Sequence, residues 1–177
     1  MGLRRGISPI LLIIAVVLFA VGGAAGAALV GQAPKCPSAA DASRGEKEIG
    51  DLLEKSGSVT VNDSEATAIA QKYVAGKVGN TRVCFTSGLA NASGNIKVGP
   101  LTPSFYASAG IDLSASTPKA TNLNIKVGAL PNMPVVTAQV EKIVTDLINE
   151  NLAKIILKKK YSVDFSTGST TVNKLSK

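Results

Sequence analysis

The feature that most restricts the fold of this chain is a run of apolar residues at helical spacing after Pro134. Gly128, Pro131 and Pro134 interrupt the extended segment before it, and the first helical turn tolerates the missing N–H of Pro134. The apolar positions are Val136, Val140, Ile143, Val144, Leu147, Ile148, Leu152, Ile155 and Ile156. Their spacing predicts one long amphipathic helix up to Lys160, with the lysines at 158–160 at the negative end of its dipole. The rest of the chain must cover its apolar face.

The segments around this run alternate apolar and polar residues, the pattern of half-buried strands. Before the run, strands are predicted at 81–86, 96–98, 105–113 and 123–127, with a turn over 91–95; two more follow at 161–166 and 170–173. Helical patterns cover 46–55 and the stretch after a capping box at Asn62 and Glu65. The order is helix, four strands, long amphipathic helix, two strands. It predicts an α+β fold on a curved antiparallel sheet.

The N-terminal segment 1–30 is predicted to be a membrane anchor. Arg4 and Arg5 precede an uncharged run from Ile7 to Val30, which exceeds the roughly 20 residues that cross a bilayer. Cleavage as a signal remains open, because small residues near Gly26 suit a peptidase. The arginines predict an N-in/C-out, single-pass protein in the plasma membrane, with the rest extracytoplasmic. Residues 31–58 form a juxtamembrane arm and 59–177 the α+β domain.

Two cysteines and the absence of histidine limit the chemistry of the chain. Cys36 and Cys84 would both lie in an oxidising compartment, so we expect a disulfide that ties the arm to the sheet. Without histidine there is no imidazole base and no usual zinc site, and no catalytic motif occurs. Asp112 and Asp164 alternate with the apolar positions and are expected on the solvent side. The chain is therefore predicted to be non-enzymatic, without metal or cofactor.

The net charge of +7 does not indicate a nucleic-acid partner, because the lysines are scattered and aromatic residues make up only 4%. The sequences Asn62-Asp63-Ser64 and Asn91-Ala92-Ser93 match the acceptor pattern for N-glycosylation. They matter only in an organism that glycosylates exported proteins.

Three segments resemble small bacterial envelope proteins of the LmeA-like type and, more distantly, tubular lipid-binding (TULIP-like) domains. They are Val59–Val74, Gly94–Val98, and Ile125–Pro131 leading into Val135–Leu157. The resemblance covers about residues 59–173 and implies binding of a lipid or another hydrophobic ligand without catalysis. Alanines on the strands leave room for a ligand or for a strongly curved sheet. The expected ligand-binding residues are Val140, Ile143, Val144, Leu147, Ile148, Phe105, Ile111 and Phe165.

The alternative is a structural or protein-interaction module of the cell envelope. It would have a solid core made of the same side chains, and it would bind another envelope protein, for example through a sheet edge. The sequence does not decide between these two functions.

Overall fold

The computed structural model describes residues 36–128, 133–153, 155–157 and 159–175. The predicted anchor over 1–30 lies outside these ranges. In the ranges described, no helix is both long enough and apolar enough to cross a bilayer. The elements in chain order are η1 (Ala39–Asp41), α2 (Glu46–Ser56), β1 (Ser58–Asn62), α3 (Asp63–Val74), β2 (Val78–Thr86), β3 (Leu89–Ile96), β4 (Ser104–Asp112), β5 (Lys119–Val127), α4 (Pro134–Ala153), β6 (Tyr161–Ser166) and β7 (Ser169–Lys174).

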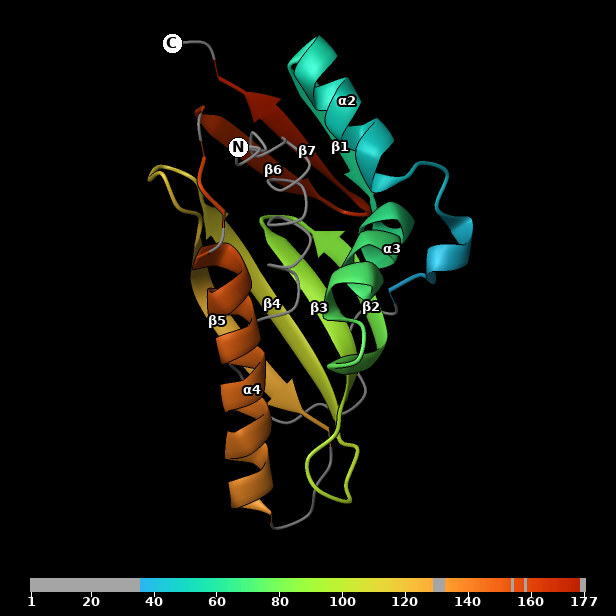
Figure 1. Cartoon of the computed structure of the whole chain (residues 1–177), viewed down its shortest axis with the longest axis vertical. Helices are drawn as coiled ribbons and strands as arrows, with labels where there is room; N and C mark the ends of the chain where they lie inside the picture. Colours follow the sequence, from blue (N-terminus) through green and yellow to red (C-terminus); the bar gives the residue numbers. More distant parts are fainter. Residues whose placement is uncertain (1–35, 129–132, 154, 158, 176–177) are drawn as a thin grey trace, which may run out of the picture.

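The predicted α+β class is confirmed, but the strands form two antiparallel sheets instead of one (Figure 1). The larger sheet has the order β2-β3-β4-β5, and the smaller has the order β1-β7-β6. The short segment around Thr60 pairs with the last strand, opposite Thr171, and this pairing takes both C-terminal strands into a separate sheet. The ring of Phe165 in β6 stacks on Phe85 in β2, with 5.8 Å between centroids, so one core joins the two sheets.

The predicted turn over 91–95 is wrong, because β3 runs straight through it. The turn lies at Gly88, which has a φ of 75°. The side chain of Asn91 is satisfied by cross-strand partners and needs no turn. Gly94 is required by close packing: a Cβ there would lie 2.5 Å from Val78 Cγ1 and 3.2 Å from Phe105 Cε1.

The long helix is confirmed, but it ends at Ala153 and not at Lys160. The backbone leaves the helix because the N–H of Leu157 donates to the carbonyl of Ser116, in the β4–β5 connection, at 2.7 Å. Lys159 therefore lies beyond the helix, where its Nζ is 3.4 Å from Glu54. The predicted interaction of this lysine with the helix dipole is wrong.

The two N-terminal helices agree with their sequence signals. Ile49 and Leu53 of α2 are fully buried, whereas Leu52 is 36% exposed. The capping box is confirmed: the side chain of Asn62 accepts from the N–H of Glu65, and the carboxylate of Glu65 accepts from the N–H of Asn62. α3 therefore begins directly after Asn62, as the capping box predicted.

Candidate functional site

One face of the four-stranded sheet is apolar and has alanine at its centre. Side chains alternate between the two faces of a strand, so positions paired across the strands share a face. Ala92 of β3 pairs with Ala107 of β4, and Ala90 pairs with Ala109. These four alanines are fully buried. Larger apolar side chains of the same face lie on the outer strands, at Phe85 and at positions 125 and 127.

Two helices flank this face (Figure 1). The main contacts of α3 with the sheet are with β2, and those of α4 are with β5. The central strands β3 and β4, which carry the alanine pairs, therefore lie between the two helices. Both helices contribute to the core that includes the alanines.

The eight predicted ligand-binding residues all belong to one hydrophobic core. On α4, the side chains of Val140, Val144, Leu147 and Ile148 are buried, and Ile143 is half-buried. Phe105 is buried on β4, whereas Ile111 lies at the other end of that strand, opposite Ala120. Phe165 comes from the smaller sheet and stacks on Phe85. The eight predicted residues include no alanine, although the strand alanines were expected to leave room for a ligand or for a curved sheet.

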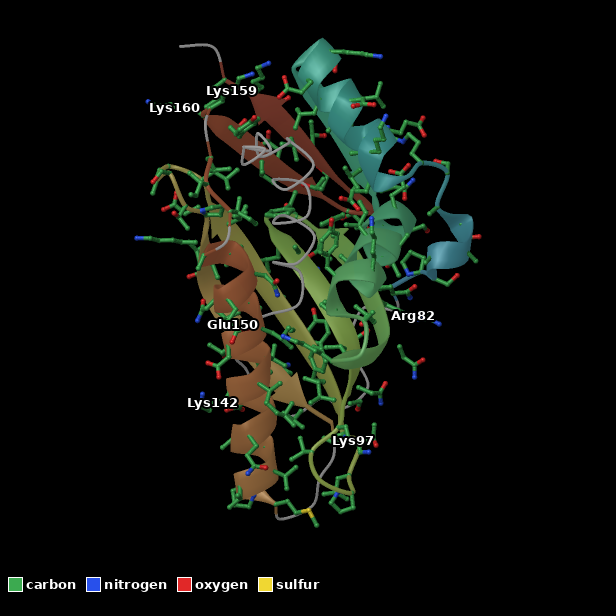
Figure 2. The ribbon with its side chains drawn as sticks, in the orientation of Figure 1. Arg82, Lys97, Lys142, Glu150, Lys159 and Lys160 are labelled. Carbon is green, nitrogen blue, oxygen red and sulfur yellow. A yellow bond between two sulfur atoms is a disulfide. The ribbon has the colours of Figure 1, made fainter. Side chains whose placement is uncertain are left out.

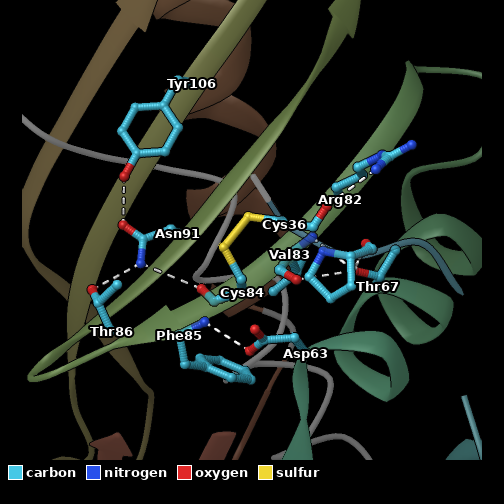
Figure 3. The surroundings of a disulfide bond; sticks show 11 residues. Cys36, Asp63, Thr67, Arg82, Val83, Cys84, Phe85, Thr86, Asn91 and Tyr106 are labelled. Carbon is cyan, nitrogen blue, oxygen red and sulfur yellow. Dashed lines mark hydrogen bonds between the residues drawn. A yellow bond between two sulfur atoms is a disulfide. The ribbon is translucent and has the colours of Figure 1, made fainter. Parts of the chain in front are cut away.

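The outer edge of β2 is closed by a polar row on α3 (Figure 3). The N–H of Phe85 donates to the carboxylate of Asp63 at 2.9 Å, and the N–H of Val83 donates to the hydroxyl of Thr67 at 2.8 Å. The side chain of Gln71 donates to the carbonyl of Thr81 at 2.9 Å. Burial raises the pKa of Asp63, and the N–H of Phe85 partly offsets this effect. The spacing of four residues between these side chains was visible in the sequence, but the prediction did not use it.

A buried ion pair fixes the arm to the same helix. The guanidinium of Arg44 donates to both oxygens of Glu65, at 2.6 and 2.7 Å, and to the carbonyl of Thr60. Burial of the Glu65 carboxylate would raise its pKa, but hydrogen bonds from Arg44, from the N–H of Asn62 and from Ser43 hold it below its usual value. All the acceptor positions of this carboxylate are used, which indicates a structural role.

The predicted disulfide is confirmed. Cys36 is bonded to Cys84, with 5.1 Å between their Cα atoms, on the face of the sheet opposite the alanines (Figure 3). On that face the hydroxyl of Tyr106 donates to Asn91 at 2.6 Å, and the amide of Asn91 donates to Thr86 at 3.0 Å. Burial raises the pKa of Tyr106.

Neither glycosylation pattern offers a free asparagine in the folded chain. Asn62 caps α3, and Asn91 is 2% exposed. We therefore assign both side chains to the fold and not to modification.

The ionisable side chains of the described ranges do not assemble a metal site: no group of three or more acidic or cysteine residues lies together there. Asp164 is exposed and Asp112 is partly exposed, as predicted. Among the residues that the structure describes, shallow hollows lie along α2 from Gly45 to Lys55 and at the α3–β2 turn beside Lys97. The alanines at the centre of the apolar face line neither hollow. The side chains at its centre are apolar and suited to packing against hydrocarbon.

Comparison of the chain with known protein families, with curated proteins and with solved structures found no match.

Proposed function

We propose that this protein is a membrane-anchored, extracytoplasmic, non-catalytic domain that binds a lipid or another hydrophobic ligand. The ligand lies on the apolar face of the four-stranded sheet, between α3 and α4. The N-terminal run from Ile7 to Val30 serves as the anchor, with the N-terminus inside.

The observation that carries the proposal is the pair of cross-strand alanine contacts at the centre of the sheet. Protein interiors are close-packed. If only the sheet and its two flanking helices formed the core, large side chains would be needed to fill the space between α3 and α4. Ala92 and Ala107 have only methyl groups, whereas larger apolar side chains stand on the outer strands, on α4 and toward one end of the central strands, at Ile96 and Phe105. This arrangement provides a floor for an elongated hydrocarbon chain with taller side chains along its edges.

The second support is the way in which α4 is held. The hydrogen bonds described for its side chains stay within the helix or go to Met133. Its only described ion contact with the α3 side joins Glu150 to Lys77 at 3.9 Å, and both side chains are more than half exposed. Apolar contacts have no preferred direction, so α4 can shift on β5 without leaving polar groups unpaired. Because the alanines are buried, such a shift is the route by which a ligand reaches them.

The substitution Ala107→Leu tests this proposal, with Ala153→Leu on the exposed end of α4 as its matched control. If a ligand occupies the apolar face, Ala107→Leu fills that space, and lipid co-purifying with the full chain disappears from its native mass spectrum. The extracted protein then keeps or gains thermal stability. If the core is solid, the added side chain overpacks it and lowers the free energy of unfolding by about 1–3 kcal/mol. Ala153→Leu changes neither lipid content nor stability.

A second candidate function is a protein-interaction module that uses the outer edge of β5. The N–H of Gly128 donates to the carbonyl of Ser104, so the alternating pattern turns the backbone groups of Ile125 and Val127 away from β4. In the described ranges these groups have no backbone partner. An added strand could pair there. In that case the substitution Ile125→Pro, which removes an outward N–H, would abolish partner binding, and the wild type would carry no lipid.

A further inference from the structure

The second face of the four-stranded sheet is polar and carries only positive charge in its central rows. The register defines two complete rows across β2, β3, β4 and β5. They read Arg82, Ser93, Tyr106, Lys126 and Cys84, Asn91, Ser108, Asn124. We call these eight positions the cationic polar face. It contains no carboxylate, and its two cations stand on the outer strands. Arg82 is exposed, and Ser93, Tyr106, Asn124 and Lys126 are partly exposed, whereas Cys84, Asn91 and Ser108 are buried. The accessible part of the face is therefore the row from Arg82 to Lys126 together with Asn124.

The N-terminal end of the described chain is fixed to this face. Cys36 is bonded to Cys84, and the guanidinium of Arg82 donates to the carbonyl of Cys36 at 3.1 Å (Figure 3). Only the residues 31–35 separate Cys36 from the end of the apolar run at Val30. Such a segment spans at most about 20 Å. If the apolar run crosses a bilayer, the cationic polar face is held close to the point where the chain enters it.

We infer that the cationic polar face rests on the anionic phospholipid headgroups of the bilayer that holds the anchor. This inference depends on the membrane-anchored part of the proposed function. The exposed Lys97 directly follows β3, and Figure 2 shows it and Arg82 apart from Lys142 and Glu150 across the width of the sheet. Strand register separates the two faces, and α4 packs into the core on the alanine face. A few cations attract an anionic surface only weakly, but the tether supplies a high local concentration. The contact therefore orients the domain and turns α4 away from the membrane.

The absence of tryptophan allows a direct test. A single tryptophan is placed by Asn124→Trp on the cationic polar face or by Glu141→Trp on the exposed side of α4. Each full-length variant is incorporated into phosphatidylglycerol vesicles that contain a lipid with a quencher near its headgroup. We expect loss of fluorescence from the tryptophan at 124 and unchanged fluorescence from the one at 141. Equal quenching at both positions would overturn the inference.

Charge is tested in the Asn124→Trp background. Combining Arg82→Gln with Lys126→Gln should restore the fluorescence, whereas the matched pair Lys142→Gln and Lys160→Gln should not. Replacing phosphatidylglycerol by phosphatidylcholine should also restore the tryptophan fluorescence, although the protein itself is unchanged. This experiment controls for structural effects of the substitution at Arg82. Quenching that persists in phosphatidylcholine contradicts the inference, as does failure of the chain to enter vesicles. If the protein carries a lipid ligand and enters vesicles but the tryptophan at position 124 is not quenched, the headgroup contact is wrong and the proposed function still stands.

Discussion

The two outer strands of the larger sheet meet their helices in different ways. α3 presents Asp63, Thr67 and Gln71 at intervals of four residues, and each side chain bonds to the backbone of β2. α4 presents Val140, Val144 and Ile148 at the same interval, and their buried aliphatic side chains have no hydrogen-bond donor or acceptor. The disulfide and the ion pair between Arg44 and Glu65 add further ties on the β2 side.

This difference indicates which wall of the apolar face is fixed. Hydrogen bonds require a defined distance and angle, so they set the position of α3 along β2. Hydrophobic contacts between α4 and β5 stabilise in proportion to buried area and tolerate small displacements. The sealed β2 side therefore provides a rigid frame, and in the proposed function α4 is the wall that moves to admit a ligand.

The largest effect on the sealed side is expected from breaking the disulfide. Replacing Cys36 and Cys84 by serine frees a connection across 48 residues, which costs about 4 kcal/mol of stability on the chain-entropy account. Urea unfolding of the two forms measures the loss. Equal midpoints would show that the arm is held by its other contacts.

Arg44→Met should have the next largest effect. It leaves the fully buried carboxylate of Glu65 without its cation, which costs about 3 kcal/mol. The control is Lys47→Met, which removes an exposed pair with Asp51 and should change stability by less than about 0.5 kcal/mol. Similar urea midpoints for the two variants would contradict the structural role of the buried pair.

Thr67→Val tests the sealed edge of β2 itself. The change keeps the shape of the side chain but leaves the N–H and C=O of Val83 without their partner, at a cost of about 2 kcal/mol. Thr137→Val on α4 removes a hydroxyl bonded only within its own turn and should be nearly neutral. Thermal unfolding of both variants measures the two changes in stability. If Thr67→Val leaves stability unchanged, the β2–α3 contact is held no more firmly by hydrogen bonds than the β5–α4 contact.

Amide hydrogen exchange should separate the two helices without any substitution. We expect amides of α4, such as those of Val144 and Ile148, to exchange through a local opening below the free energy of global unfolding. Amides of α3, such as that of Ile69, should exchange only with global unfolding. Equal protection in both helices would show that α4 is not the movable wall.

The smallest effect concerns pH. The carboxyl of Glu65 has a lowered pKa in the folded chain, so its contribution to stability is complete above the unfolded pKa and is lost as the pH falls through the folded one. Asp63 has a raised pKa and acts in the opposite direction. Urea unfolding between neutral pH and pH 3 should therefore show a shallower loss for Glu65→Gln than for the wild type. Parallel curves would contradict the lowered pKa.

Local signals in the sequence predicted the elements well, because the deciding contacts lie within a few residues. The capping box at Asn62 and the apolar periodicity of α4 are of this kind. The errors arose where distant contacts decide. Leu157 leaves the helix to reach Ser116, and Gly94 continues a strand because Phe105 packs on it. The separation into two sheets depends on β1 pairing with β7 across more than a hundred residues, which no local pattern encodes.

The candidate site was predictable only in part for the same reason. The apolar stripe of α4 follows from its period, so Val140 and Leu147 were correctly placed on the covered side of the helix. Their role in ligand binding stays a prediction. Phe165 was expected among the ligand-binding residues, but its stacking on Phe85 depends on the second sheet. The alanine pairs depend on strand register, which alternation alone does not give.

The most direct test of the central claim is native mass spectrometry of the full chain, with extraction and identification of bound lipid, on the wild type and on Ala107→Leu. The account predicts a lipid adduct on the wild type that is absent from the stable Ala107→Leu variant and present on Ala153→Leu. A wild type that stays folded with a clean apo mass and takes up no added lipid would contradict hydrophobic-ligand binding.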